Sequence, residues 1–249
     1  AVFLFTIMVS NYLKIHPLLF SIPIMLIIVA FAMMLYYTYT RSLRLHKHLK
    51  THFLSSLEEE RKSISREMHD TISVFSISMK NNIQQHEDIK AYEKAAWLEQ
   101  IIAFEKNIQD INELLYPIEL KHGSLFSALD RLCLILQKSG KTVMIINMCY
   151  NIHIPNQSII HIYRILQESI VNIFKHTENS RISLSLFEEN NELNAIISYH
   201  SEEKINTNRY DKNRRGQLIL QERLDLINGS RSIAWEEDVV FEKFKFQCI

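Results

Sequence analysis

The sequence predicts an α-helical half followed by an α/β half: a transmembrane helix, a helical hairpin that dimerises into a four-helix bundle, and an α/β sandwich. Three observations predict this class. Residues 18–37 carry no charge, residues 43–115 contain two amphipathic stretches without Gly or Pro, and the chain beyond Pro117 alternates helical and strand patterns. Helices packed on one side of a mixed sheet would bury the apolar faces of both kinds of element.

The composition excludes several classes of protein. The 249 residues include only four glycines, at 123, 140, 216 and 229, so no G-x-G-x-x-G turn and no P-loop is present. Lys+Arg and Asp+Glu both number 28, and a chain without net charge is not expected to bind nucleic acid directly. The three cysteines, at 133, 149 and 248, have no C-x-x-C spacing, which indicates reduced thiols and no structural zinc.

The first element is the apolar run at residues 18–37, LLFSIPIMLIIVAFAMMLYY. About 20 residues of helix span the ~30 Å hydrocarbon core of a bilayer, so a transmembrane helix is predicted, with a buried core helix as the alternative. Four Lys/Arg and no acid follow at residues 41–50, which places the chain after residue 41 in the cytoplasm and against membrane lipid. Residues 1–13 form a second apolar run, expected to be the tail of an earlier membrane helix.

Two amphipathic helices are predicted next, at about 43–85 and 89–115, joined by a polar turn at 86–88 and ended by Pro117. Apolar residues recur at close to 3.5-residue spacing, at Leu57, Ile64, Met68, Ile72, Phe75 and Met79 in the first and at Trp97, Ile101, Phe104, Ile108, Ile111 and Leu115 in the second. One hairpin cannot cover such a stripe, so a homodimer is expected.

The α/β half is predicted from alternating patterns. Helices are expected at about 124–138, 155–176 and 218–228, and strands at 142–148, 181–189, 192–200, 231–237 and 239–248. Asn190-Asn191 marks a hairpin turn, and a polar loop of about 15 residues leads to Arg215. The buried face of the second helix should be formed by Ile159, Ile162, Ile165, Leu166, Ile170 and Ile173.

The segment REMHD holds the most informative candidates, His69 and Asp70. Since Met68 belongs to the apolar stripe, His69 is rotated about 100° away from it and should face solvent. An exposed imidazole beside a carboxylate can accept a phosphoryl group, while a solvated surface histidine is the plain alternative.

Four segments resemble sensor histidine kinases of the DesK/NarX/LiaS type, which pair with LuxR-like response regulators. EEERKSISREMHD, at 58–70, resembles the phosphoacceptor segment, and YPIELKHGSLFSALDRL, at 116–132, the linker into the catalytic domain. IYRILQESIVNIFKH, at 162–176, resembles the N box of the GHKL ATP-binding fold, and ERLDLING, at 222–229, the end of its last helix. The resemblance extends from about Leu57 to the C-terminus.

The resemblance implies a function and a set of site residues. His69 would be the phosphoacceptor and Asp70 the base that takes its proton. Glu168 and Asn172 would hold Mg²⁺, and together with Lys175, His176 and Gly216 they would bind ATP. The implied partners are a second copy of the chain and the receiver domain of a response regulator. The implied domains are a membrane segment at 1–40, a signalling helix at 41–60, a dimerisation and histidine phosphotransfer hairpin at 61–118, and a GHKL-like catalytic domain at 119–249.

The sequence departs from this family at three places. The adenine-binding motif D-x-G-x-G is replaced by residues 199–203, YHSEE, so Tyr199 stands where the family has Asp. RRGQL keeps Gly216 but has Arg214 in place of an earlier glycine, and Val74 replaces a glutamine that serves regulator dephosphorylation. These departures leave a second hypothesis open, a pseudokinase that acts as a signalling and docking module without using ATP.

Overall fold

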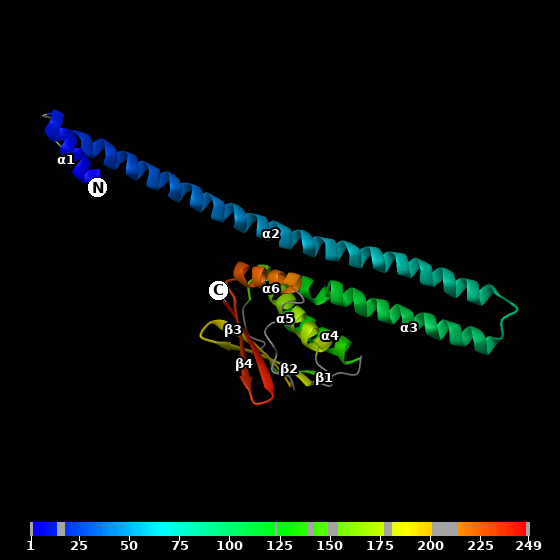
Figure 1. The fold of residues 1–249 in the computed structure, drawn as a ribbon. Coiled ribbons are helices and arrows are strands. Elements are labelled where there is room, and N and C mark those ends of the chain that lie inside the picture. The colour runs from blue at the N-terminus through cyan, green and yellow to red at the C-terminus, as the bar shows by residue number, and fades with distance from the viewer. Residues whose placement is uncertain are drawn as a thin grey trace. The chain divides into compact units, whose positions relative to one another are not determined.

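The computed structural model describes residues 2–13, 18–122, 124–138, 142–148, 154–176, 181–200 and 214–247. The chain divides into two compact units, Ala1–Phe53 and Leu54–Ile249. The boundary lies inside a single long helix, α2 (Leu18–Gln85), which follows the short helix α1 (Val2–Leu13) (Figure 1). Residues 14–17, between these two helices, are outside the described part of the chain.

The N-terminal part of α2 is long and apolar enough to cross a membrane, and its apolar window is not buried against the rest of the protein. The hairpin helix was expected to begin near Leu43, but residues 38–42 are helical as well. They contain neither Gly nor Pro, and the hydroxyls of Thr38 and Thr40 donate to the carbonyls of Leu35 and Tyr37, at 2.9 and 3.0 Å, so nothing interrupts the helix.

The predicted helical hairpin is confirmed. α2 ends at Gln85 and α3 (Ala91–Leu115) returns beside it. Ile83 and Ile101 are buried, and Lys80 Nζ donates to both carboxylate oxygens of Glu105 at 2.8 Å. The two helices are therefore held together by a narrow apolar seam flanked by an ion pair.

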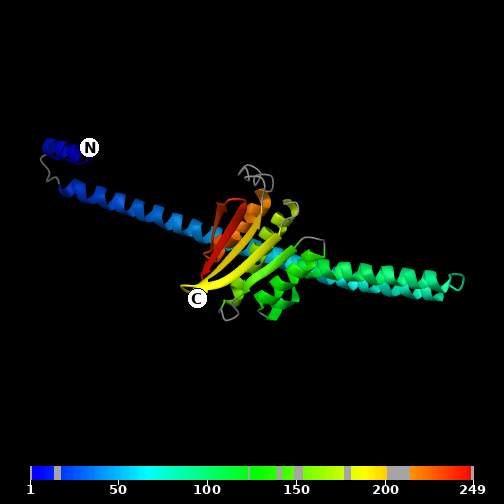
Figure 2. The same cartoon turned by 90° about the horizontal axis from the view of Figure 1, so that it is seen from below.

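The second half has the predicted order of elements. A 3₁₀ turn, η1 (Ile118–His122), leads to α4 (Leu125–Gln137), β1 (Thr142–Met148), α5 (Asn156–His176), β2 (Arg181–Glu189), β3 (Glu192–His200), α6 (Arg214–Leu226), β4 (Ser230–Glu236) and β5 (Val239–Gln247). The strands form one sheet in the order β1-β2-β3-β5-β4, in which β1 and β2 are parallel and the other pairs antiparallel. Figure 2 shows this sheet with the helices on one side of it.

The core lies between that sheet and the helices. On β3 the buried apolar side chains lie at every second position, at Leu193, Ala195, Ile197 and Tyr199, as expected for a strand with one covered face, and Asn194 is buried as well. All six apolar residues predicted for the inner face of α5 are at most 5% exposed. The prediction of an α/β layer with helices on one side is confirmed.

Two of the connections contain residue types that suit their backbone geometry. Asn190 and Asn191 have φ values of 54° and 63°, which fits a two-residue turn between β2 and β3. Gly229 joins α6 to β4 at a close approach, because a Cβ there would lie 3.0 Å from Leu224 Cδ2 and 3.2 Å from the carbonyl oxygen of Lys245.

Candidate active site

His69 and Asp70 lie on α2, both with exposed side chains. The exposure predicted for His69 is confirmed. Consecutive residues project about 100° apart around a helix, so the two side chains share a level on α2 but point in different directions. The residues around them, Arg66, Glu67 and Thr71, are exposed as well, so this stretch of α2 is open to solvent.

The polar face predicted on α5 contains a preformed pair. Asn172 Nδ2 donates to Glu168 Oε1 at 3.0 Å, one helical turn away, and both side chains are half-buried. Lys175 is exposed near the end of the helix, whereas the side chain of His176 is outside the described part of the structure. Gly216 lies in the first turn of a different helix, α6.

A carboxylate that the sequence reasoning missed lies beneath this face. Glu242 on β5 is 1% exposed, accepts a hydrogen bond from Ser169 Oγ on α5 at 3.0 Å, and pairs with Arg231 on β4. Burial raises the pKa of Glu242, and the charge of Arg231 opposes that rise. The signal was present in the alternation of β5, because Glu242 occupies an inward position between Val240 and Phe244.

Tyr199, which replaces the aspartate of the adenine motif, is 2% exposed and belongs to the core. It lies opposite Ile182 on β2 and Val240 on β5, so its ring is part of an apolar row across the sheet. The remaining positions of that motif, 201–203, and the polar loop after them lie outside the described residues.

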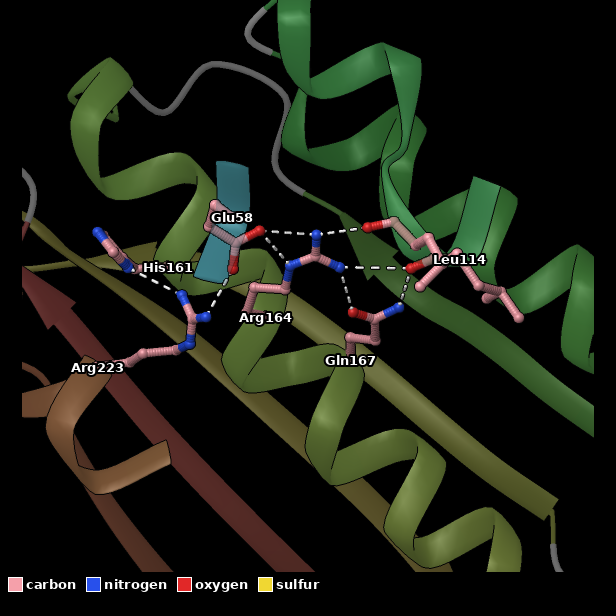
Figure 3. Close-up of polar contacts among 7 residues, drawn as sticks. Glu58, Leu114, His161, Arg164, Gln167 and Arg223 are labelled. Atoms are coloured by element: carbon pink, nitrogen blue, oxygen red, sulfur yellow. Dashed lines mark hydrogen bonds and ion pairs between the residues drawn. The ribbon is translucent and has the colours of Figure 1, made fainter. Parts of the chain in front are cut away.

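A second polar cluster joins the hairpin to the α/β half, and we name Glu58, Arg164 and Arg223 the Glu58 clasp (Figure 3). Glu58 Oε2 accepts from Arg164 Nε and Nη2 at 3.0 and 2.8 Å, and its Oε1 accepts from Arg223 Nη2 at 2.6 Å. The side chains of the two arginines are each 3% exposed and that of Glu58 13%. One carboxylate of α2 is therefore shared by guanidinium groups of α5 and α6.

Arg164 also reaches the C-terminal end of α3. Its Nη2 donates to the carbonyl oxygen of Leu115 at 2.7 Å, and its Nη1 donates to that of Leu114 at 3.3 Å. Gln167 binds the same end of α3, since its Nε2 donates to the Leu114 carbonyl at 2.8 Å. The last carbonyls of a helix lack intrahelical partners and carry partial negative charge, so a guanidinium is well placed there.

His161 is the outer member of this cluster. It lies on α5, and its Nδ1 is 3.1 Å from Arg223 Nη1. Burial and the neighbouring charge of Arg223 lower the pKa of His161 to about 4, against the opposing charge of Glu58. The imidazole is therefore neutral at pH 7, and Nδ1 accepts the hydrogen bond because a guanidinium can only donate.

The electrostatics of the clasp favour the ionised carboxylate. Burial alone would raise the pKa of Glu58, but the charges and hydrogen bonds of Arg164 and Arg223 outweigh it and lower that pKa. Burial and the charge of Arg164 lower the pKa of Arg61, one turn further along α2, while Glu58 and Glu168 oppose that shift. Glu168, a residue of the α5 face, is thus within electrostatic reach of α2.

No family model and no curated protein sequence matches the chain. Several solved structures are similar in fold. The blue-light activated histidine kinase EL346 of Erythrobacter litoralis matches 74% of this chain at 9% identity with a TM-score of 0.46, and the match covers 59% of that protein. The histidine kinase AdeS of Acinetobacter baumannii matches 70% of this chain at 9% identity with a TM-score of 0.39, covering 95% of its own chain. ShkA in complex with AMPPNP matches 76% of this chain at 12% identity with a TM-score of 0.41, covering 45% of ShkA.

Proposed function

We propose that the protein is a membrane-bound sensor histidine kinase of a two-component system. It autophosphorylates on His69 from ATP and transfers the phosphoryl group to an aspartate of a LuxR-type response regulator. The observation that carries the proposal is an exposed His69 beside Asp70 on a helical hairpin, followed in the same chain by an α/β layer with a preformed Glu168–Asn172 pair. The order of the motifs that resemble the DesK/NarX/LiaS type supports it.

The chemistry follows from these residues. An imidazole nitrogen of His69 attacks the γ-phosphorus of ATP, the bond from that phosphorus to the bridging oxygen breaks, and ADP leaves. Asp70 takes the proton that the imidazole loses in this step. In the second step, a carboxylate oxygen of the regulator's aspartate forms a bond to the phosphorus while the bond between that phosphorus and the His69 nitrogen breaks. The carboxylate of Glu168 and the amide oxygen of Asn172 are the hard oxygen ligands that suit Mg²⁺.

Mg²⁺ would neutralise phosphate charge during this transfer. Among the described residues, no three His, Cys, Asp or Glu side chains converge as a metal cage. Mg²⁺ is commonly bound through one or two protein groups plus substrate phosphates and water, and Glu168 and Asn172 would be those two groups. Lys175, His176 and Gly216 are the proposed phosphate contacts.

The proposed working form is a parallel homodimer anchored in the cytoplasmic membrane by α2, with the residues after 41 in the cytoplasm. The apolar stripe of the hairpin supports the dimer, because the chain itself leaves much of it uncovered. Its most exposed members are Ile64, Phe75, Met79, Trp97, Phe104 and Ile111, which are 38–58% exposed. A second hairpin would cover them in a four-helix bundle.

A second candidate function, a pseudokinase that docks a regulator or partner kinase, is favoured by Tyr199. Its ring lies in the core at the position where the resembled family reads adenine with a carboxylate. The two candidates differ in whether the chain uses ATP. A phosphorylation experiment with labelled ATP separates the two candidates.

The test is incubation of the full chain, in detergent or lipid nanodiscs, with γ-labelled ATP and Mg²⁺. We expect acid-labile label on the wild type, none on His69→Gln, and undiminished label on His86→Gln, which removes another exposed histidine of the hairpin. Label that persists in His69→Gln would overturn the assignment of the phosphoacceptor. No label on any chain, with no nucleotide bound at millimolar concentration, would favour the pseudokinase.

A further inference from the structure

A chain of four side chains connects the two helices that carry the candidate nucleotide residues. Ser169 of α5 donates its hydroxyl hydrogen to Glu242 Oε1 of β5 at 3.0 Å, and Arg231 of β4 forms an ion pair with the same oxygen. Arg231 Nη1 also donates to Gln217 Oε1 of α6, at 2.6 Å. We name Ser169, Glu242, Arg231 and Gln217 the Glu242 network.

Both ends of this network lie beside residues proposed to bind the nucleotide. On α5, Ser169 directly follows Glu168 and precedes Asn172 by three residues. On α6, Gln217 directly follows Gly216 in the first turn of the helix. Consecutive residues of a helix are rotated by about 100°, so a hydroxyl held against the sheet fixes the directions in which the neighbouring side chains of α5 project. One buried carboxylate therefore orients both parts of the candidate site.

The central groups of the Glu242 network lie among apolar side chains. The side chains of Glu242 and Arg231 are 2% and 15% exposed, and Ser169 is 3% exposed. The neighbours of Glu242 on the inner face of β5 are Val240 and Phe244, both fully buried. Burial raises the pKa of Glu242, whereas the charge of Arg231 and the hydrogen bond of Ser169 oppose that rise. The carboxylate thus depends on both of its partners.

Stability alone does not account for charged groups at this place. Removing two charges from water costs free energy that their mutual attraction offsets only in part, and apolar side chains of similar volume often stabilise a core as well or better. An apolar residue at position 242 would simply continue the inner row of β5. A hydrogen-bonded ion pair differs from such a residue because it is directional and fixes the relative positions of its partners.

We propose that Glu242 and Arg231 are positioning residues, which hold α5 and the first turn of α6 in the arrangement that binds a nucleotide with Mg²⁺. They act through Ser169 and Gln217. The inference rests on the proposed kinase function, because the residues being positioned are its candidate nucleotide contacts. Loss of the Glu242 network should loosen the first turn of α6 and weaken nucleotide binding without unfolding the layer.

The first variant cuts the network at α6. Gln217→Ala removes the acceptor of Arg231 and leaves the buried pair in place. The matched control is Gln221→Ala, at an exposed position one turn further along α6. The affinity for ADP with Mg²⁺, measured by titration calorimetry on the full chain in nanodiscs, should fall about tenfold in Gln217→Ala, a size typical of residues that support ligand-binding groups. Gln221→Ala should bind as the wild type does.

The second variant replaces the buried groups by apolar side chains. Ser169→Ala, Glu242→Leu and Arg231→Met are combined in one chain, so that none of the three groups is left without a partner. The midpoint of urea unfolding should equal or exceed that of the wild type. The affinity for ADP should nevertheless fall about tenfold, as in Gln217→Ala.

Hydrogen–deuterium exchange without nucleotide measures the positioning itself. The backbone amides of residues 214–220 should exchange faster in both variants than in the wild type and in Gln221→Ala. The amides of β3 should exchange at the rate of the wild type in all four chains. A merely structural role would instead speed exchange throughout the α/β layer.

The outcomes distinguish the network from the kinase function. Unchanged ADP affinity in both variants, or unchanged exchange at residues 214–220, would overturn the positioning role while His69 labelling upholds the kinase. A lower unfolding midpoint in the triple variant would also overturn it, because the network would then serve stability. If the wild type binds no nucleotide, the kinase proposal fails and the positioning role falls with it. Weaker binding with faster exchange confined to α6 and an undiminished midpoint supports the inference.

Discussion

Asn172 donates its side-chain amide hydrogen to Glu168 over 3.0 Å, one turn apart on α5. That bond fixes the orientation of the Asn172 amide, so its oxygen points away from the Glu168 oxygen that accepts the bond. Glu168 keeps a second carboxylate oxygen for another partner. For both side chains to bind the proposed Mg²⁺, the Asn172 amide would have to turn so that its oxygen faces the ion together with a Glu168 oxygen.

Asn172→Ala should weaken Mg²⁺-dependent nucleotide binding by about 10- to 100-fold, the usual effect of disturbing a metal ligand or its support. Chelation of Mg²⁺ should weaken binding of the wild type to the same level. Titration calorimetry with ADP measures both effects. The control is Gln157→Ala, an exposed residue in the first turn of the same helix, which should bind as the wild type does. Equal binding by Asn172→Ala and the wild type would remove this face from the nucleotide site.

Tyr199 gives an expectation about base selectivity. The resembled family reads the adenine amino group with a carboxylate, and here a buried phenol ring occupies that position. Loss of one such hydrogen bond costs about 1–3 kcal/mol, or about 5- to 150-fold in affinity. ATP binding should therefore be weak, and GTP should compete within a factor of about five.

Competition of unlabelled ATP and GTP against a fluorescent nucleotide measures this selectivity. Tyr199→Phe, which keeps the ring and removes the hydroxyl, should show the same lack of preference. Micromolar ATP affinity with GTP excluded would contradict the expectation and show that another group reads the base.

The local patterns of the sequence predicted the α/β layer because they are set by neighbouring residues. The 3.6-residue spacing of isoleucines fixed the inner face of α5, and Asn190-Asn191 fixed the hairpin between β2 and β3. The continuity of α2 was predicted less well, because the membrane helix was expected to end near residue 37 and the hairpin helix to begin near Leu43. A change from apolar to basic composition near residue 40 suggested a boundary, but the helix continues through residues 38–42, which include no Gly or Pro.

The Glu58 clasp was beyond sequence reasoning for a physical reason. Glu58 and Arg164 are 106 residues apart, and Glu58 and Arg223 are 165 apart, so no local period relates them. One signal did exist. Arg164 stands among Ile162, Tyr163, Ile165 and Leu166, all buried, and an arginine in such a position requires a partner. The sequence indicates that need but does not name the carboxylate that meets it.

The apolar stripe predicts what a single charge would do to the dimer. Ile72→Lys would place an ammonium group at the centre of the proposed four-helix bundle, and a buried unpaired charge costs several kcal/mol. The dimer should weaken by more than about 100-fold. Analytical ultracentrifugation of the full chain in detergent measures it. Thr71→Lys, an exposed neighbour on α2, should remain dimeric, and a dimeric Ile72→Lys would exclude this stripe as the interface.

His161 predicts how stability depends on pH. Its pKa is lowered from 6.5 to about 4 in the folded protein, so between these values the unfolded chain binds more protons. The stability associated with neutral His161 is therefore fully present above about pH 6.5 and is lost as the pH falls toward 4. The difference corresponds to about 3 kcal/mol at 1.36 kcal/mol per pKa unit.

Glu58 extends the same trend to lower pH, because its pKa is also lowered: its contribution is present above 4.5 and is lost as the pH falls through its folded value. The midpoint of urea unfolding, followed by near-ultraviolet circular dichroism in detergent, should drop between pH 6.5 and 4. In His161→Gln the amide oxygen can still accept from Arg223 but does not titrate, so the drop in this window should shrink. His86→Gln should unfold with the pH dependence of the wild type. A His161→Gln chain with the full pH dependence would show that another group titrates, and that Arg223 does not depend on a neutral imidazole.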